Sequence, residues 1–489
     1  MKKGVYEIFK LLNISYKKKM NKNKELIKNT AIIFVGKFCT QFISFLLVPI
    51  YTNFLSTNDY GYIDLVQTYI SLLVPILILR FDSGVFRFLI DERNNENGKK
   101  KIISNIIIFL IFQFVFFTIL YFGFNYFFKI KYFYAILINI IFMGISSILL
   151  QIARGIGDNI GYSIASIISG IVTIISNIIF IIIFRGNASY ILISSGLANI
   201  VCSIFLFIRN KIYKYIKWSF TDKNKFKEIA KYSLPMIPDG LSWWVVNVSD
   251  RTIISLLINA SANGIYAVSS KFSNILSSLF QVFNMSWQES ASLHINDEDR
   301  ETFFTNTLNS VYRIFYSICV LIIVLIPVVF KLVIGNEFKE AYLYIPPLIY
   351  GNLYNALANV IGGVYIAKKN TKSVAKTTMF AAIINIIINF VMINRIGLFA
   401  AAVSTFISYF ILTIYRYFDV RKYLKIKFEY KILASTTIVF IIITILYYLN
   451  NLYTNIANIL IAVICCTILN KDIIKMFLER LGMKKWKEY

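Results

Sequence analysis

Residues 232–257 read YSLPMIPDGLSWWVVNVSDRTIISLL, and this stretch decides the class of fold. It is long enough to cross a bilayer, because about 20 mostly apolar residues span the hydrocarbon as one helix. It also contains Asp239, Asp250 and Arg251. An ionisable side chain in hydrocarbon costs about 3 kcal/mol or more, so it persists mainly where it faces a bundle interior or a watery pathway. The stretch therefore predicts either a transport pathway or structural ion pairs between membrane helices.

Apolar segments of similar length recur along the whole chain, which has 489 residues and is 57% hydrophobic. They predict an all-α polytopic membrane protein with about 14 transmembrane helices. The predicted spans are residues 30–51, 60–80, 103–123, 132–152, 160–184, 190–208, 232–257, 262–285, 307–330, 341–366, 374–393, 398–417, 431–449 and 453–469. The gaps between them are too short for a soluble domain.

The net charge of +26 would suit a nucleic-acid partner, but its distribution indicates a membrane. Of the 51 Lys and Arg residues, 41 lie in or beside the two tails and the even-numbered connections, and six lie in the odd-numbered connections. By the positive-inside rule, both termini are predicted to be cytoplasmic, and no nucleic-acid partner is expected. The single histidine and five scattered cysteines offer no ligand spacing, so neither a metal, a cofactor nor a catalytic residue is expected.

A weak internal repeat suggests how the spans are grouped. LSTNDYGYI at 55–63 and INASANGIY at 258–266 both lead through a polar turn and a glycine into a span. Repeats in transporters point to a binding site at their interface. The predicted parts are a basic cytoplasmic tail (1–29), an N-lobe of six spans (30–208), a basic linker (209–231), a C-lobe of six spans (232–417), two further spans (431–469) and a basic tail (470–489).

Polar side chains recur at helical spacing on four predicted spans, so each set lies on one helix face. They are Lys37 and Gln41 on the first span, Asn247 and Arg251 on the seventh, Lys271, Asn274, Ser278 and Gln281 on the eighth, and Asn352, Asn355 and Asn359 on the tenth. Such stripes can be interhelical hydrogen bonds, worth about 0.6 kcal/mol each in membranes. The cations among them favour a hydrated, net cationic cavity between the lobes.

Several phrases resemble a known family. These are SLPMIPDGLSWW at 233–244 with SDR at 249–251, GIYAV at 264–268, FNMSWQ at 283–288 and LRFDSGVFRF at 79–88. They resemble the Wzx-type oligosaccharide flippases of polysaccharide biosynthesis, in the multidrug/oligosaccharidyl-lipid/polysaccharide exporter superfamily. The resemblance implies a transporter rather than an enzyme. It would move a polyprenyl-diphosphate-linked oligosaccharide from the inner to the outer leaflet by alternating access, for a surface polysaccharide such as lipopolysaccharide O-antigen or capsule. Membrane lipids, a polymerase and glycosyltransferases would be its partners.

The resemblance suggests roles for the polar residues. Lys37, Arg251 and Lys271 would meet the substrate diphosphate at successive depths, with Arg80 and Arg313 nearer the cytoplasmic mouth. The remaining polar stripe residues would line the cavity for the sugars. Candidates for binding a coupling H⁺ or Na⁺ are Asp64, Asp239, Asp250 and Glu289. Pro235, Pro238 and Gly240 predict a hinge in the seventh span.

Three alternatives remain from the sequence. A drug exporter of the same superfamily would favour an acidic, aromatic cavity. A flippase for a lipid-linked peptidoglycan precursor would share the span number and the cationic cavity, so the sequence separates it poorly. A membrane polysaccharide polymerase or ligase would need a large outer loop with catalytic Arg or His, whereas the odd-numbered connections are short.

Overall fold

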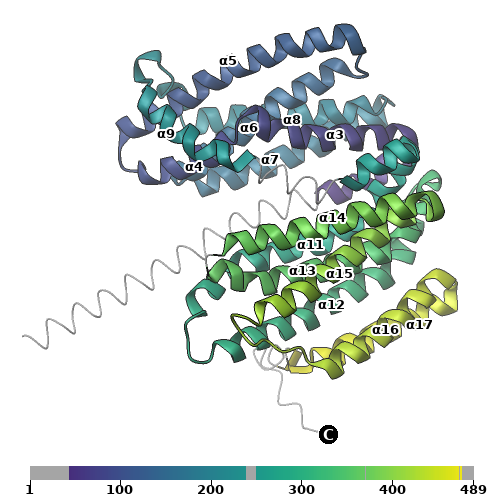
Figure 1. Ribbon diagram of the computed structural model, residues 1–489. Helices are drawn as coiled ribbons and strands as arrows, with labels where there is room; N and C mark the ends of the chain where they lie inside the picture. Colours follow the sequence, from purple (N-terminus) through teal and green to yellow (C-terminus); the bar gives the residue numbers. More distant parts are fainter. Residues whose placement is uncertain (1–42, 238–248, 369, 473, 476–489) are drawn as a thin grey trace, which may run out of the picture. The chain divides into compact units, whose positions relative to one another are not determined.

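The computed structural model describes residues 43–237, 249–368, 370–472 and 474–475, which form helices and turns with no strand among them (Figure 1). This confirms the predicted all-α class. Six predicted site residues lie outside the described residues, and they are Lys37, Gln41, Pro238, Asp239, Gly240 and Asn247.

The chain divides into two compact units. Unit 1 comprises Met1–Leu46 and Tyr69–Gly240, and unit 2 comprises Leu47–Thr68 and Leu241–Tyr489. The helix α3 (Thr57–Leu77) therefore contributes its first half to unit 2 and its second half to unit 1. The lobe boundaries predicted from the sequence stay a prediction.

Unit 1 is a helix bundle around one apolar core. Its helices are α4 (Phe81–Asp91), α5 (Glu96–Phe128), α6 (Phe133–Ile156), α7 (Asn159–Asn177), α8 (Ser189–Arg209) and α9 (Lys223–Ser233). A π-helix, η1 (Ile178–Ile183), prolongs α7, and short 3₁₀ turns lie at η2 (Ile212–Lys214), η3 (Trp218–Phe220) and η4 (Leu234–Met236). Val85, Leu89, Ile102, Ile148 and Ile229 are fully buried at the centre. Helices α4, α5, α6 and α9 thus share one core.

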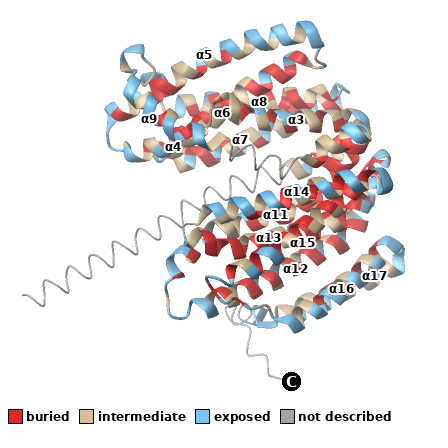
Figure 2. Ribbon diagram, in the orientation of Figure 1, coloured by how far each residue is buried: buried red, intermediate tan, exposed pale blue. Residues whose placement is uncertain are grey.

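Unit 2 contains the short α2 (Val48–Phe54), the beginning of α3 and the later helices. These are α11 (Ala260–His294), α12 (Arg300–Val333), the 3₁₀ segment η5 (Asn336–Tyr344), α13 (Ile345–Ala367), α14 (Thr371–Ile396), α15 (Phe399–Val420), α16 (Tyr430–Leu449) and α17 (Leu452–Leu469). Residues 249–257 are also helical. Figure 2 shows that α16 and α17 bury few side chains, whereas α13 is buried along most of its length. The last two helices therefore form an outer hairpin of this unit.

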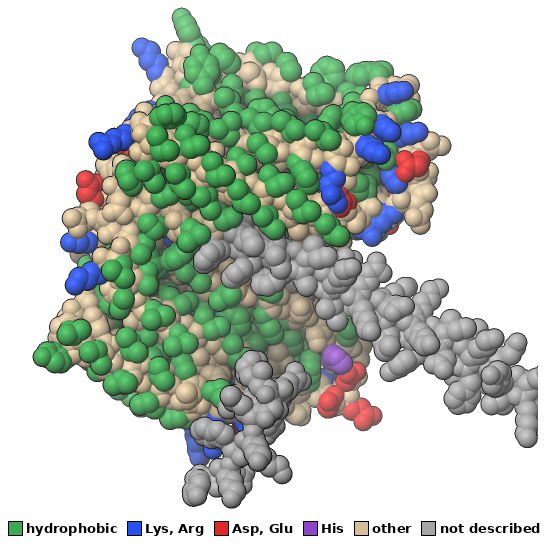
Figure 3. Space-filling view, turned by 180° about the vertical axis from the view of Figure 1, so that it is seen from behind, with side chains coloured by type: hydrophobic (Ala, Val, Ile, Leu, Met, Phe, Trp, Pro, Cys, Tyr) green, Lys and Arg blue, Asp and Glu red, His purple; other side chains and the backbone are tan. Residues whose placement is uncertain are grey.

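Ten of the described helices are long and apolar enough to cross a membrane. Hydrophobic side chains cover most of the helix surface visible in Figure 3. Such surfaces are stable in lipid because a helix satisfies its own backbone hydrogen bonds. Two further long helices, α11 and α13, fall below this level of apolarity, and they carry the polar stripes noted above. The chain is a multi-pass membrane protein, and the count of 14 spans stays a prediction.

The predicted second span, 60–80, ends differently from the prediction. Leu79 and Arg80 both have positive φ, 51° and 54°, in the left-handed region that L residues seldom adopt. The helix is broken here, and Arg80 becomes the residue that precedes α4. This places the Arg80 side chain beside Ser83, to which it donates a 3.2 Å hydrogen bond, and 3.9 Å from Asp82.

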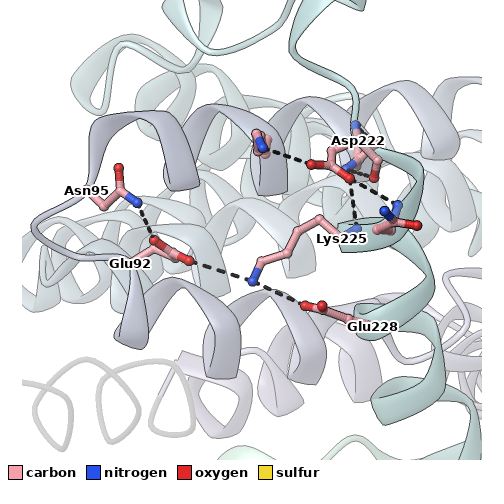
Figure 4. A network of polar contacts seen from close by, with 8 residues as sticks. Glu92, Asn95, Asp222, Lys225 and Glu228 are labelled. Atoms are coloured by element: carbon pink, nitrogen blue, oxygen red, sulfur yellow. Dashed lines mark hydrogen bonds and ion pairs between the residues drawn. The ribbon is translucent and has the colours of Figure 1, made fainter.

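The basic linker that follows α8 is docked on unit 1. Asp222 caps the N-terminus of α9 by accepting from the backbone N–H groups of Asn224 and Lys225. Lys225 lies between Glu92 of α4 and Glu228 of α9, at 3.6 Å and 3.2 Å (Figure 4). Apolar packing adds to this network, because Ile229 is fully buried. The linker is therefore an ordered part of unit 1.

Candidate functional site

Two adjacent residues in unit 2, Asp250 and Arg251, form separate polar contacts with different helices. The Arg251 Nε donates to Asp64 Oδ2 of α3 at 2.6 Å, and the two side chains are only 15% and 10% exposed. A buried pair of this kind is favourable only with good geometry, since both charges lose their hydration. Arg251 is thus already neutralised by a carboxylate that the sequence had suggested as a separate ion-binding group.

Asp250 is enclosed by side-chain donors from three other helices. It accepts hydrogen bonds from Tyr266 of α11 at 2.9 Å, from Asn389 of α14 at 3.0 Å and from Thr405 of α15 at 2.8 Å. With its amide oriented to match its neighbours, Asn385 of α14 also donates to Asp250 Oδ1 at 3.0 Å. We refer to these five residues as the Asp250 cage. The Asn389 Oδ1 is buried and has no hydrogen-bond partner among the described residues.

Lys271 of α11 is the cation of this region that stays available. It has no carboxylate within 4.0 Å among the described residues, although Asp64 and Arg251 lie close enough to act on its charge. The structure thus brings together four of the predicted residues, namely Asp64, Asp250, Arg251 and Lys271. With two carboxylates and two cations, this group is charge-balanced rather than net cationic.

The polar stripe along α11 continues away from Lys271. Asn274 and Ser278 are half-buried, and Gln281 is exposed. Ser278 bonds to its own helix at the Asn274 carbonyl, 2.8 Å, whereas the Asn274 and Gln281 side chains have no partner within the described part of the chain. These two amides can therefore still bind a ligand.

The stripe along α13 is partly used for packing. Asn352 donates to the Ser273 carbonyl of α11 at 2.9 Å, so it joins two helices. Asn359 donates to Asn355 on its own helix, at 2.9 Å to the carbonyl and 3.0 Å to the side chain. For Asn352, the interhelical explanation considered from the sequence is the one that the contacts support.

The other predicted residues that the structure describes make contacts of their own or lie in unit 1. Arg313 of α12 bonds to Glu429, directly before α16. The turn between α11 and α12 separates Lys271 from Arg313 along the chain. Arg313 is closer to this turn than Lys271 is, by about ten residues, which is roughly 15 Å along a helix. Arg80 lies in unit 1, Glu289 is exposed near the end of α11, and Pro235 lies in the 3₁₀ turn η4. Of these four, Arg313 and Glu289 share unit 2 with the Asp250 cage, and among the described residues no hydrogen bond or ion pair joins either of them to it.

The helix crossing beside this group depends on two glycines. A Cβ on Gly61 would lie 1.8 Å from the Ala260 carbonyl oxygen, and one on Gly264 would lie 2.1 Å from that of Thr57. Asn263 donates to the Gly61 carbonyl at 2.8 Å across the same crossing. Glycine is required here because two backbones touch. This close approach positions Asp64 of α3 near the residues of α11.

A recess of about 410 Å³ lies beside the turn that joins α11 to α12. Its wall combines the rings of Phe283, Phe303 and Phe315 with the polar side chains of Asn306 and Ser310. Lys271 is not among its lining residues, so the recess and the charged group are separate features of unit 2.

The family described as "Polysaccharide biosynthesis protein" matches residues 26–287, more than half of the chain. No curated protein matches the sequence.

Solved structures share the fold at low sequence identity. An inward-facing multidrug resistance transporter of the MATE family, in the MOP superfamily, has a TM-score of 0.68 at 13% identity and covers 78% of this chain and 94% of its own. The lipid II flippase MurJ in its inward closed conformation has a TM-score of 0.67 at 17% identity, covering 92% and 99%. An outward-facing MATE transporter has a TM-score of 0.59 at 13% identity, covering 81% and 94%. The chain belongs to the polysaccharide biosynthesis protein family and has the fold of the MOP-superfamily transporters.

Proposed function

We propose that this protein moves a polyprenyl-diphosphate-linked oligosaccharide across the bacterial inner membrane, from the inner to the outer leaflet, for assembly of a surface polysaccharide such as O-antigen or capsule. The observation that carries the proposal is the charged group of Asp64, Asp250, Arg251 and Lys271 on helices of a multi-pass protein of this family. Ionisable residues within membrane helices are rare and commonly mark a substrate or ion path.

Each part of such a substrate has a matching group. Its prenyl chain can stay in the bilayer, its diphosphate needs cations, and its sugars need hydrogen-bonding side chains. Lys271 offers an ammonium with no carboxylate within 4.0 Å among the described residues, and Asn274 and Gln281 lie on the same helix face. Arg251 would join the diphosphate by exchanging Asp64 for phosphate oxygens, which a guanidinium binds in a two-pronged geometry. Lys37, Arg80 and Arg313 are proposed as further phosphate contacts, and Gln41, Asn247, Asn355 and Asn359 as further cavity residues.

The Asp250 cage is proposed as the place where a coupling H⁺ or Na⁺ acts. Hard cations bind carboxylate, amide and hydroxyl oxygens, and the cage contains all three kinds. The buried Asn389 Oδ1, which lacks a partner among the described residues, fits a cation held beside Asp250. A bound cation would replace the donors that now satisfy the carboxylate. Asp64, Asp239 and Glu289 stay further candidates, and the bend at Pro235, Pro238 and Gly240 is the proposed hinge.

A second candidate is supported by one comparison. The lipid II flippase structure covers 92% of this chain, and the MATE transporter structures compared above cover 78% and 81%. This favours a lipid-linked substrate over a soluble drug, and it leaves a peptidoglycan precursor as the alternative cargo.

The test is transport by the full chain in proteoliposomes with three fluorescent cargoes: a polyprenyl-diphosphate oligosaccharide, a lipid-linked muropeptide and a cationic drug. We expect the protein to transport the oligosaccharide lipid fastest. Lys271→Ala should stop this movement, whereas Lys331→Ala, at the exposed end of α12, should not. Movement of the drug alone, or equal transport by Lys271→Ala, would refute the proposal.

A further inference from the structure

The linker between α8 and α9 packs against α5 of unit 1, where Ser104 and Asn105 hold it by hydrogen bonds. Ser104 donates to the Tyr215 carbonyl and accepts from the Lys217 backbone N–H at 3.3 Å. The next residue of α5, Asn105, makes a pair of hydrogen bonds with the Asp222 backbone, at 3.0 Å and 3.2 Å. The turn η3 is thus held on both sides by α5.

The acids around this turn already have partners. Asp222 accepts from the Lys101 ammonium at 2.8 Å, and this bond, with the backbone N–H groups at the start of α9, lowers the pKa of the Asp222 carboxyl. Glu96 accepts from Lys99 and from the Tyr215 hydroxyl. Among the residues that the structure describes, no carboxylate lies within 4.0 Å of Lys100 or Lys217.

Lys100 and Lys217 lie over the same aromatic ring, and Glu96 is close enough to act on the charge of Lys100. The Lys100 and Lys217 ammonium groups are 5.3 Å and 5.7 Å from the centroid of the Phe220 ring. The ring attracts both cations, and the two like charges repel one another. An anion bound by both would remove that repulsion, and the flexible lysine stems allow the ammonium groups to converge on it.

An apolar surface begins beside this cation pair. Trp218, next to Lys217, is 68% exposed, and its ring packs edge-on against Phe112 of α5 at 6.1 Å. Phe112 lies about twelve residues beyond Lys100, or roughly 18 Å along the helix. Four exposed side chains continue from there on one face of α5, at i, i+3, i+4 and i+7. They are Phe112, Val115, Phe116 and Ile119. The two lysines at the turn are therefore followed along α5 by an exposed apolar stripe.

We propose that this surface is a specific site for one anionic phospholipid. Its phosphate lies between Lys100 and Lys217, and its acyl chains lie along Trp218 and the exposed face of α5. The ammonium groups of Lys100 and Lys217 select a negative headgroup, and the adjoining apolar stripe selects a lipid over a free anion. The site belongs to unit 1 alone and does not depend on what the protein transports.

The test measures lipid binding by native mass spectrometry of the full chain in detergent, titrated with phosphatidylglycerol. The Lys100→Ala/Lys217→Ala variant should bind about thirtyfold more weakly, or about fivefold for each basic group. The matched control is Lys425→Ala/Lys427→Ala, which removes two exposed lysines from unit 2 and should change binding less than twofold. Equal affinity for phosphatidylcholine, or unchanged binding by the first variant, would overturn the proposal. Displacement of the lipid by millimolar inorganic phosphate would show a free-anion site instead, which also overturns it.

Fluorescence keeps the test independent of protein yield. The fluorescence of Trp218 is obtained as the difference in emission between the wild type and Trp218→Phe in reconstituted membranes. Brominated phosphatidylglycerol should quench this contribution more than brominated phosphatidylcholine at the same mole fraction. Equal quenching by the two lipids would contradict a selective site.

Discussion

Replacing Arg251 with Ala should destabilise unit 2 strongly, because it leaves the Asp64 carboxylate buried without its partner. The pair has a 2.6 Å contact and side chains 15% and 10% exposed. Removing one member of a buried pair costs about 3–5 kcal/mol. That is a large fraction of the roughly 5–15 kcal/mol that stabilises a typical folded domain. The melting temperature should fall by on the order of 10 °C.

The same chain offers a matched control. Arg87 and Asp91 of α4 also make a 2.6 Å contact, but their side chains are 50% and 60% exposed. Solvent screens such a pair, so Arg87→Ala should shift the melting temperature far less. The assay is thermal unfolding of both variants in the same detergent.

The double variant Asp64→Ala/Arg251→Ala separates charge from packing. It removes both charges, so it should regain much of the stability lost in Arg251→Ala. Equal effects of Arg251→Ala and Arg87→Ala would refute the reasoning, since burial would then not matter. A double variant less stable than Arg251→Ala would also refute it.

Three further results are expected. Asp250→Asn should fold but lose any stimulation of transport by Na⁺ or by a proton gradient. The assay is transport in proteoliposomes, with choline as the control cation. If transport by the variant is still stimulated by ions, Asp250 has no role in coupling. Gly264→Ala should destabilise the protein by at least about 2 kcal/mol in thermal unfolding, because its Cβ would meet a backbone oxygen, whereas Gly123→Ala, with nothing within 4 Å, should be tolerated. The pKa of Asp222 is lowered in the folded protein, so its contribution to linker docking should be complete above the unfolded pKa of about 3.9. This contribution should be lost as the pH falls through the folded pKa. Trp218 fluorescence is the readout, and Asp222→Asn should remove the pH dependence.

Much of the fold follows from the sequence because lipid leaves a chain few choices. The span predicted at 190–208 lies within α8, and that predicted at 132–152 lies within α6 except for its first residue, since an unbroken apolar run in hydrocarbon must be helical. The break at Leu79 and Arg80 could not be predicted, because neither residue is Gly or Pro. The π-helix that prolongs α7 likewise has no sequence signal, as its residues are all Ile or Phe.

The members of the charged group could be predicted, but their pairing could not. Asp64, Asp250, Arg251 and Lys271 are conspicuous because ionisable residues are rare in apolar spans. That Asp64 neutralises Arg251 depends on how α3 packs in unit 2, and spacing within a single helix carries no information about it.

The four neutral members of the Asp250 cage could not be predicted for a related reason. Tyr266, Asn385, Asn389 and Thr405 are neutral, and such side chains are common in membrane helices. Asn385 and Asn389 are four residues apart on one helix face, and this spacing was the available signal.

The most direct measurement is the affinity of the purified protein for a polyprenyl diphosphate carrying a short oligosaccharide. A charge-assisted contact is worth about 1.5–3 kcal/mol, so Lys271→Ala should weaken binding roughly 10- to 100-fold. Lys271→Arg, which keeps the charge, should recover most of it, and Lys331→Ala should bind like the wild type. If Lys271→Ala binds the lipid as tightly as the wild type does, the charged group of unit 2 is not the diphosphate site.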